Sequence, residues 1–96
     1  MMNEKLKEKP VTELVRALLC LETEEEMLAY LEDVCTVNEI LTIAQRHAVA
    51  SMLREHRTYI EIMEKTGAST ATISRVNRSL ASGGAGYETV FERLKR

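Results

Sequence analysis

Tryptophan, proline and glycine are scarce in this 96-residue sequence, and their scarcity limits the folds it can adopt. It has no tryptophan, one proline, four glycines and only four other aromatic residues. A β-sandwich needs frequent turns and many β-branched or aromatic strand residues, whereas leucine, alanine, glutamate and arginine favour helices. We therefore expect an all-α fold. A chain of this length rarely builds two cores, so we expect one domain, 1–96.

Long apolar runs are absent as well. No stretch approaches the ~20 apolar residues of a membrane span. The charged start, Met1 to Lys9, lacks the pattern of a secretory signal. We expect a cytoplasmic protein with no membrane partner.

Cysteine and histidine occur twice each, in no pattern that holds a metal ion. Cys20 and Cys35 lie among apolar residues without a CxxC partner, and we expect two reduced thiols in the core. His47 and His56 each stand alone, so packed or solvent-facing imidazoles are expected. No phosphate loop, nucleophile elbow or paired acid and base occurs. We expect no metal, no required cofactor and no enzyme activity.

Charge is unevenly spread along the chain, although the net charge is only -2. From Glu22 to Glu39 there are seven acids and no base, whereas from Arg46 to Arg78 six bases accompany three acids. The second half suits an anionic partner. As an alternative, the charges of either half are those of ordinary helix surfaces exposed to solvent, which explains them equally well without a partner.

Three threonines are followed three residues later by a glutamate, which is the spacing of a helix capping box. Apolar residues recur every three or four positions behind these threonines and elsewhere. The capping pairs are Thr23 with Glu26, Thr36 with Glu39, and Thr58 with Glu61.

About six helices are predicted from these patterns. Their apolar stripes need more burial than a short monomer provides, so we expect a C2 homodimer. The helices are one opened by Pro10 and reaching Leu19, one carrying Met27 to Val34, a long one from Val37 to about Arg54–Arg57, one from Thr58 to Gly67, one from about Ser69 to Leu80 and, after a loop of Ser82, Gly83, Gly84 and Gly86, one carrying Tyr87 to Leu94.

The segment 58–80 has the features of a helix-turn-helix: a short helix, a glycine turn and a second helix with one apolar face. Gly67 suits the positive φ that ends the first helix. The expected inner-face residues are Ile62, Met63, Ile73, Val76 and Leu80.

Small polar residues at the start of the second helix are left facing outward. Their hydroxyls can bond phosphates or base edges, and an arginine can reach phosphate or guanine. A plain packing hairpin would carry longer glutamate and lysine side chains there. The expected DNA-binding residues are Ser69, Thr70, Ala71, Thr72, Ser74 and Arg78.

The run ATISR, Ala71 to Arg75, followed by Asn77, Ser79 and Leu80, resembles the recognition helix of the Trp repressor family. From Cys35 through Tyr87 the chain is most similar to the Trp-repressor-like YerC/YecD group. The resemblance implies an intertwined, all-helical homodimer that binds double-stranded DNA and regulates transcription.

The same resemblance implies a small-molecule effector site. The repressor holds its corepressor between two arginines, which match Arg46 and Arg75, with Thr36 and Ser79 nearby. The glycine after the second arginine is Val76 here, which places a β-branched side chain where the indole would lie and counts against tryptophan. As an alternative, the four residues serve as caps and ion-pair partners.

A DNA-binding transcriptional regulator, expected to be a repressor, is the function that the sequence favours. The alternative is a dimeric effector-sensing or protein-interaction module of the same fold that does not bind DNA. The acidic segment, the net charge and the scarcity of lysine on the second helix support that alternative.

Overall fold

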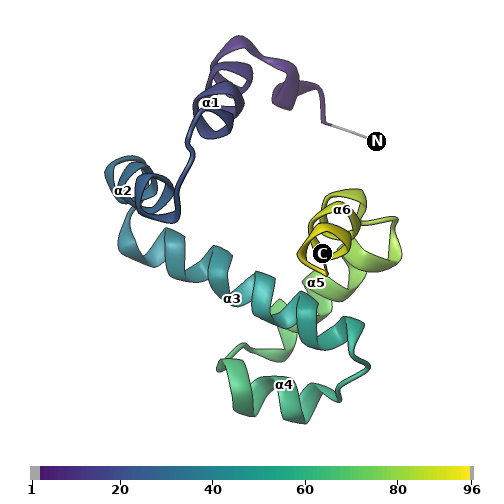
Figure 1. Ribbon diagram of the computed structural model, residues 1–96. Coiled ribbons are helices and arrows are strands. Elements are labelled where there is room, and N and C mark those ends of the chain that lie inside the picture. The colour runs from purple at the N-terminus through teal and green to yellow at the C-terminus, as the bar shows by residue number, and fades with distance from the viewer. Residues whose placement is uncertain (1–2, 96) are drawn as a thin grey trace. The chain divides into compact units, whose positions relative to one another are not determined.

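The computed structural model describes residues 3–95, which form six α-helices after one short 3₁₀ helix. No strand occurs among these residues, so the predicted all-α fold of about six helices is confirmed. The 3₁₀ helix has no counterpart among the predicted elements. The bounds are η1 Glu4–Lys7, α1 Lys9–Leu19, α2 Glu24–Val34, α3 Val37–Arg54, α4 Tyr59–Thr66, α5 Thr70–Ala81 and α6 Ala85–Leu94 (Figure 1).

Two compact units make up the described chain: an N-terminal unit, residues 3–37, and a C-terminal unit, residues 38–95. The single domain expected for residues 1–96 stays a prediction. None of the described helices is long and apolar enough to cross a lipid bilayer.

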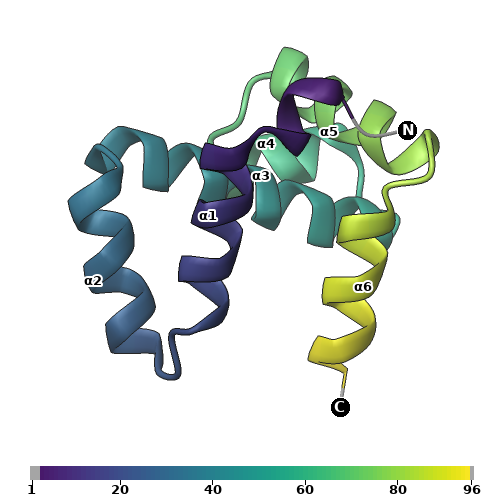
Figure 2. The same cartoon turned by 90° about the horizontal axis from the view of Figure 1, so that it is seen from above.

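The N-terminal unit consists of η1, α1 and α2, and its two α-helices run in opposite directions (Figure 2). Pro10 lies in the first turn of α1, as predicted, where its missing N–H costs nothing. The Thr23 hydroxyl accepts from the Glu26 amide at 3.1 Å, which caps α2. The second half of the predicted capping box is wrong, because the Glu26 carboxylate accepts from the Glu22 amide at 2.7 Å instead.

No described side chain of the N-terminal unit is buried. Leu19 is 78% exposed and Leu28 is 58% exposed, although both belong to apolar stripes. Cys20 is exposed too, so the expectation of a core thiol is wrong there: it follows the end of α1, no apolar layer covers it, and its Sγ donates to the Ala17 carbonyl. Cys35 is half-buried, and both thiols are free.

The C-terminal unit holds the buried core. It draws residues from α3, α4, the turn after α4, and α5, so these segments are held together by burial of apolar surface. Half-buried apolar and aromatic side chains from α3 to α6 pack around it. The buried members are Val49, Ala50, Ile62, Ala68, Ile73 and Val76.

Helix α6 lies against α3 through the ring of Phe91. His47 stacks on that ring with the centroids 5.3 Å apart, and the Arg54 guanidinium lies 5.0 Å from its centroid. Arg54 also pairs with Glu88 of α6. His47 is thus exposed to solvent yet packed on one side, which agrees with the expectation of a packed or solvent-facing imidazole.

The loop before α6 is shorter than predicted, because α6 begins at Ala85 and Gly86 belongs to the helix. Gly84 supplies the left-handed turn before α6, with φ of 47°. A Cβ there would lie 3.0 Å from the Ser79 carbonyl oxygen, so only glycine fits without a shift.

His56, two residues after the end of α3, adopts the left-handed conformation, with φ of 61°. The His56 amide donates to the Leu53 carbonyl at 3.0 Å, and the Arg57 amide donates to the Met52 carbonyl at 3.1 Å. These two bonds form a Schellman motif, whose left-handed position is usually glycine. A side chain with a Cβ is strained there.

Substituting His56→Gly should therefore stabilise the chain. Relief of the strain is worth about 1 kcal/mol, which corresponds to a rise of roughly 4–8 °C in Tm for a domain of this size. Thermal denaturation followed by circular dichroism at one protein concentration measures it. His56→Ala is the control, because it keeps the Cβ; an equal rise in both variants would contradict the explanation.

Candidate nucleic-acid interface

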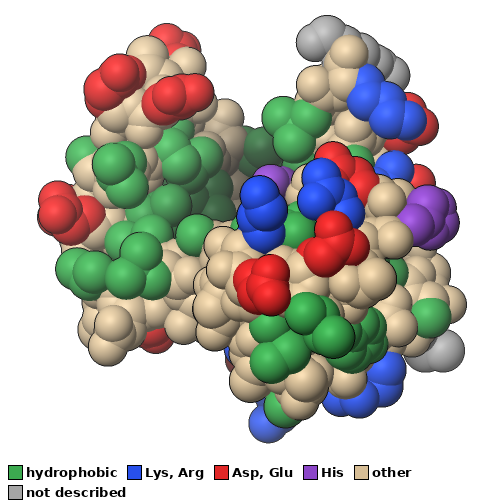
Figure 3. Space-filling model, turned by 90° about the horizontal axis from the view of Figure 1, so that it is seen from below, with side chains coloured by type: hydrophobic (Ala, Val, Ile, Leu, Met, Phe, Trp, Pro, Cys, Tyr) green, Lys and Arg blue, Asp and Glu red, His purple; other side chains and the backbone are tan. Residues whose placement is uncertain are grey.

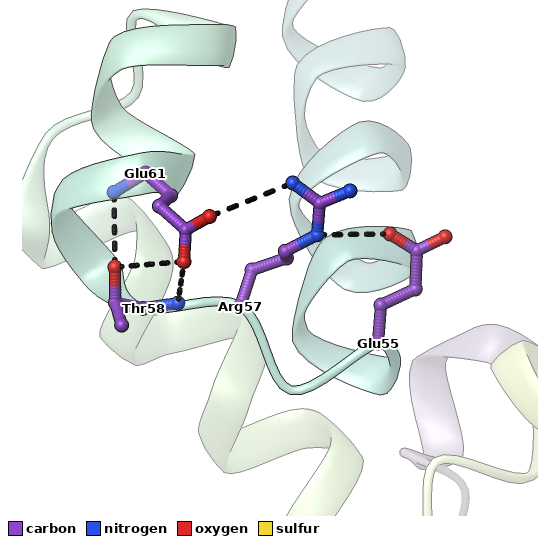
Figure 4. Close-up of polar contacts among 4 residues, drawn as sticks. All are labelled: Glu55, Arg57, Thr58 and Glu61. Carbon is purple, nitrogen blue, oxygen red and sulfur yellow. Dashed lines mark hydrogen bonds and ion pairs between the residues drawn. The ribbon is translucent and has the colours of Figure 1, made fainter.

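The predicted helix-turn-helix corresponds to α4, the turn 67–69 and α5, and the two helices contact each other. Helix α4 begins with the predicted capping box (Figure 4). The Thr58 hydroxyl accepts from the Glu61 amide at 3.2 Å, and the Glu61 carboxylate accepts from the Thr58 amide at 3.0 Å. The start of α4 is therefore determined by two residues three positions apart.

Arg57, just before α4, lies between two carboxylates (Figure 4). Its Nε is 3.5 Å from Glu55 Oε1, and its Nη1 is 3.6 Å from Glu61 Oε2. The backbone amide of Thr58, followed by its hydroxyl and the charge of Arg57, lowers the pKa of Glu61 below its ordinary value of 4.5. Two nearby carboxylates thus partly offset the charge of Arg57.

A lowered pKa in the folded state makes stability depend on pH. The ionised Glu61 stabilises the fold above pH 4.5, and this contribution is lost as the pH falls through the lowered folded pKa. Glu61→Gln keeps a carbonyl acceptor and does not titrate. We expect the Tm advantage of the wild type over Glu61→Gln to be largest near neutral pH and to shrink between about pH 5 and pH 3. Melting curves across that range would contradict this if the difference stayed constant.

The turn between the helices is built as the sequence predicts. Gly67 adopts the left-handed conformation, with φ of 73°, and its amide donates to the Met63 carbonyl at 2.9 Å. The Thr66 hydroxyl donates to the Ile62 carbonyl and accepts from the Ala68 amide. Ala68 itself is 3% exposed. The turn is therefore held by burial and by hydrogen bonds.

Helix α5 is capped by Ser69, whose hydroxyl accepts from the Thr72 amide at 3.2 Å and donates to the Thr72 hydroxyl at the same distance. Ile73 and Val76 are buried and Leu80 is half-buried, as predicted for its inner face. Among the described residues, nothing accepts from the amides of Thr70 and Ala71 at the start of this helix. Those amides and the helix dipole suit a phosphate.

The outer face of α5 carries most of the residues expected to bind DNA. Thr72 and Ser74 are half-buried. Since Ser69 and Thr72 bond each other, their hydroxyls also serve as the helix cap. The exposed residues of this face are Ser69, Thr70, Ala71, Arg75 and Arg78.

The inner face of α4 differs from the prediction in one position. Ile62 is buried as expected, but Met63 is 39% exposed. Half-buried Tyr59, one turn before Ile62 on the same face, packs against the core in its place. Ile60 is 70% exposed.

Charges on this part of the molecule are mixed. Arg57 and Arg54 are paired with carboxylates, whereas Arg46, Arg75 and Arg78 form no ion pair within residues 3–95. Figure 3 views the molecule from the side on which α4 lies and shows basic, acidic and hydrophobic side chains close together. Exposed Lys65 in the last turn of α4 forms no ion pair among these residues either, so the unpaired positive charge lies on these arginines and on Lys65.

Two of the four expected effector residues line one pocket of about 590 Å³ in the C-terminal unit. Arg46 contributes from α3 and Ser79 from α5. Arg75 is exposed on α5 and does not line this pocket. Thr36 belongs to the N-terminal unit, directly before α3, and does not line this pocket. Val76 is a core residue rather than a wall of the pocket.

The rest of the pocket wall comes from residues that the motif did not single out. The spacing of Ile43 to Arg46 and of Tyr87 to Val90 places each pair on one helix face, which is the signal that could have found them. Packing of α6 against α3 through Phe91 brings the two faces together. The additional lining residues are Ile43, His47, Gly84, Gly86, Tyr87 and Val90.

Comparisons with known proteins agree with this architecture. The family model described as Trp repressor protein matches residues 9–95. The uncharacterised protein YerC of Bacillus subtilis (strain 168) is 47% identical over 95 residues, which cover 99% of this chain and 91% of YerC.

Two crystal structures are similar over nearly their whole length. A TrpR-like protein from Eubacterium eligens ATCC 27750 is 61% identical, with a TM-score of 0.94, over 97% of this chain and 96% of that one. A Staphylococcus aureus protein described as a "putative Trp repressor" is 45% identical, with a TM-score of 0.93, over 99% of this chain and 95% of that one. The chain therefore belongs to the Trp repressor family.

Proposed function

We propose that this protein is a sequence-specific DNA-binding transcriptional regulator, acting as a repressor and as a homodimer through α4 and α5. The observation that carries the proposal is the start of α5. Ser69, Thr70 and Ala71 there are exposed, and the amides of Thr70 and Ala71 have no acceptor among residues 3–95, while the other face of the helix is anchored in the core. A helix presented in this way can enter the major groove with its first turns.

The proposed contacts divide into two kinds. Arg78 and the amides at the start of α5 suit phosphates, whereas Thr70, Ala71 and Ser74 are small enough for close approach to base edges. In a C2 dimer the two α5 helices would lie about 34 Å apart, in successive major grooves.

Dimerisation is supported by the N-terminal unit. Its described residues contain no buried side chain, yet α1 and α2 carry large apolar residues that are more than half exposed, including Leu19 and Leu28. Exposed apolar surface of this kind marks an interaction site. We propose that a second copy of the chain covers it, and Figure 3 shows hydrophobic side chains at the surface of this unit.

Fluorescence anisotropy with a labelled genomic fragment tests the proposal. We expect specific binding whose affinity falls steeply between two salt concentrations, because phosphate contacts release counterions. Binding that is equal for all fragments, or absent at low salt, would contradict it.

A second function, effector sensing by the same fold, is favoured by the pocket that Arg46 and Ser79 line. A cationic side chain over walls of isoleucine, tyrosine and valine suits a small apolar carboxylate. Thermal-shift measurements with amino acids and related carboxylates test this, with Arg46→Ala as the control. Stabilisation of the wild type that is lost in the variant supports the second function, and stabilisation by none of them counts against it.

A further inference from the structure

We infer that Gln45 of α3 is a positioning residue that holds the turn between α4 and α5 and thereby sharpens DNA recognition by α5. The inference rests on the proposed function and adds a residue outside the helix-turn-helix to it. It begins from one contact: Gln45 Nε2 donates to the Thr66 carbonyl oxygen at 3.1 Å, across 21 positions of sequence.

The acceptor in this contact is an end group of a helix. Thr66 is the last residue of α4, and the last four carbonyls of an α-helix have no partner within it. Such groups are ordinarily satisfied by water or by local caps. Here an amide from another helix satisfies one of them in a part-buried setting, where a hydrogen bond is stronger than in water.

The other bonds of the turn are local. Thr66 Oγ1 binds the Ile62 carbonyl and the Ala68 amide, and the Gly67 amide binds the Met63 carbonyl. These bonds shape the turn but do not tie it to α3. Burial of Ala68 does attach it, yet apolar contact is non-directional. The hydrogen bond from Gln45 is directional, so it fixes the orientation of the turn relative to α3.

This hydrogen bond lies close to the start of α5, the proposed recognition helix, and can therefore affect how that helix is oriented. Ser69, the cap of α5, is three residues beyond Thr66, and the outward residues of α5 follow at once. Rotation of the turn would move those residues away from the DNA bases that they are proposed to contact. A displacement of about 1 Å is already costly at a recognition site. A turn that is already fixed in the free protein also loses less conformational entropy when DNA binds.

Substitutions of similar length test the role. Gln45→Met keeps the side-chain length without the donor, Gln45→Glu presents only acceptors to the carbonyl, and Gln45→Lys restores a donor. In the free protein, we expect amide hydrogen exchange at Gly67 and Ala68 to rise roughly threefold to tenfold in Gln45→Met, more in Gln45→Glu, and to recover in Gln45→Lys. The range follows from the loss of one hydrogen bond.

The same variants are then titrated with DNA. In Gln45→Met we expect affinity for the specific fragment to fall roughly threefold to tenfold and affinity for a non-specific fragment to change less than about twofold. Unchanged amide exchange in Gln45→Met would overturn the role of Gln45, whether or not DNA is bound. Faster exchange with an unchanged ratio of specific to non-specific affinity would also overturn it. A wild type that binds no fragment specifically would contradict the proposed function instead.

Discussion

Replacing Arg78 with alanine is expected to weaken binding to the specific DNA fragment at least 30-fold. The side chain is exposed on α5 and forms no ion pair among residues 3–95, so its charge is free for DNA. A hydrogen bond to a charged group such as a phosphate is worth about 1.5–3 kcal/mol, and a dimer loses two of them. Anisotropy titrations of wild type and variant at one salt concentration measure the difference.

Arg93→Ala is the matched control for this change. It removes the same charge from an exposed residue in the last turn of α6, a helix to which no DNA contact is assigned. We expect less than about a twofold change in affinity. Equal losses in the two variants would mean that only the net charge of the chain matters, and would contradict recognition through α5.

Replacing Leu19 with lysine should break the proposed dimer. Leu19 is 78% exposed in the single chain, where a polar substitution would be nearly neutral. In a dimer that covers it, the change removes about 1.5–3 kcal/mol of burial from each protomer and buries a charge. The dissociation constant should rise at least 100-fold, as measured by analytical ultracentrifugation.

Ile60→Lys is the control for that measurement, because Ile60 is 70% exposed on α4, in the C-terminal unit. We expect this variant to remain a dimer. A monomeric wild type, or identical behaviour of the two variants, would contradict the proposal that a second copy covers the N-terminal unit.

Local chemistry explains which parts of the fold could be predicted from sequence. A cap depends on a few adjacent residues, so the starts of α4 and α5 follow from Thr58, Glu61 and Ser69. Gly67 likewise ends α4 as expected. At Glu26 the capping spacing predicted the wrong partner, because the carboxylate accepts from the Glu22 amide instead.

Features that depend on tertiary packing could not be predicted. Periodicity places Met63 and Tyr59 near the same face of α4, and only the fold decides that Tyr59 packs on the core. The bond from Gln45 to Thr66 joins segments 21 positions apart, and nothing local marks it. The pocket at Arg46 needs α6 in place, whose docking through Phe91 has no sequence motif.

Genome-wide selection of DNA fragments by the purified wild-type protein decides whether α5 recognises a DNA sequence. We expect enriched fragments that share two half-sites about one helical turn apart, because two α5 helices would read successive major grooves. Recovery of no enriched sequence, with binding equal across the genome, would contradict it.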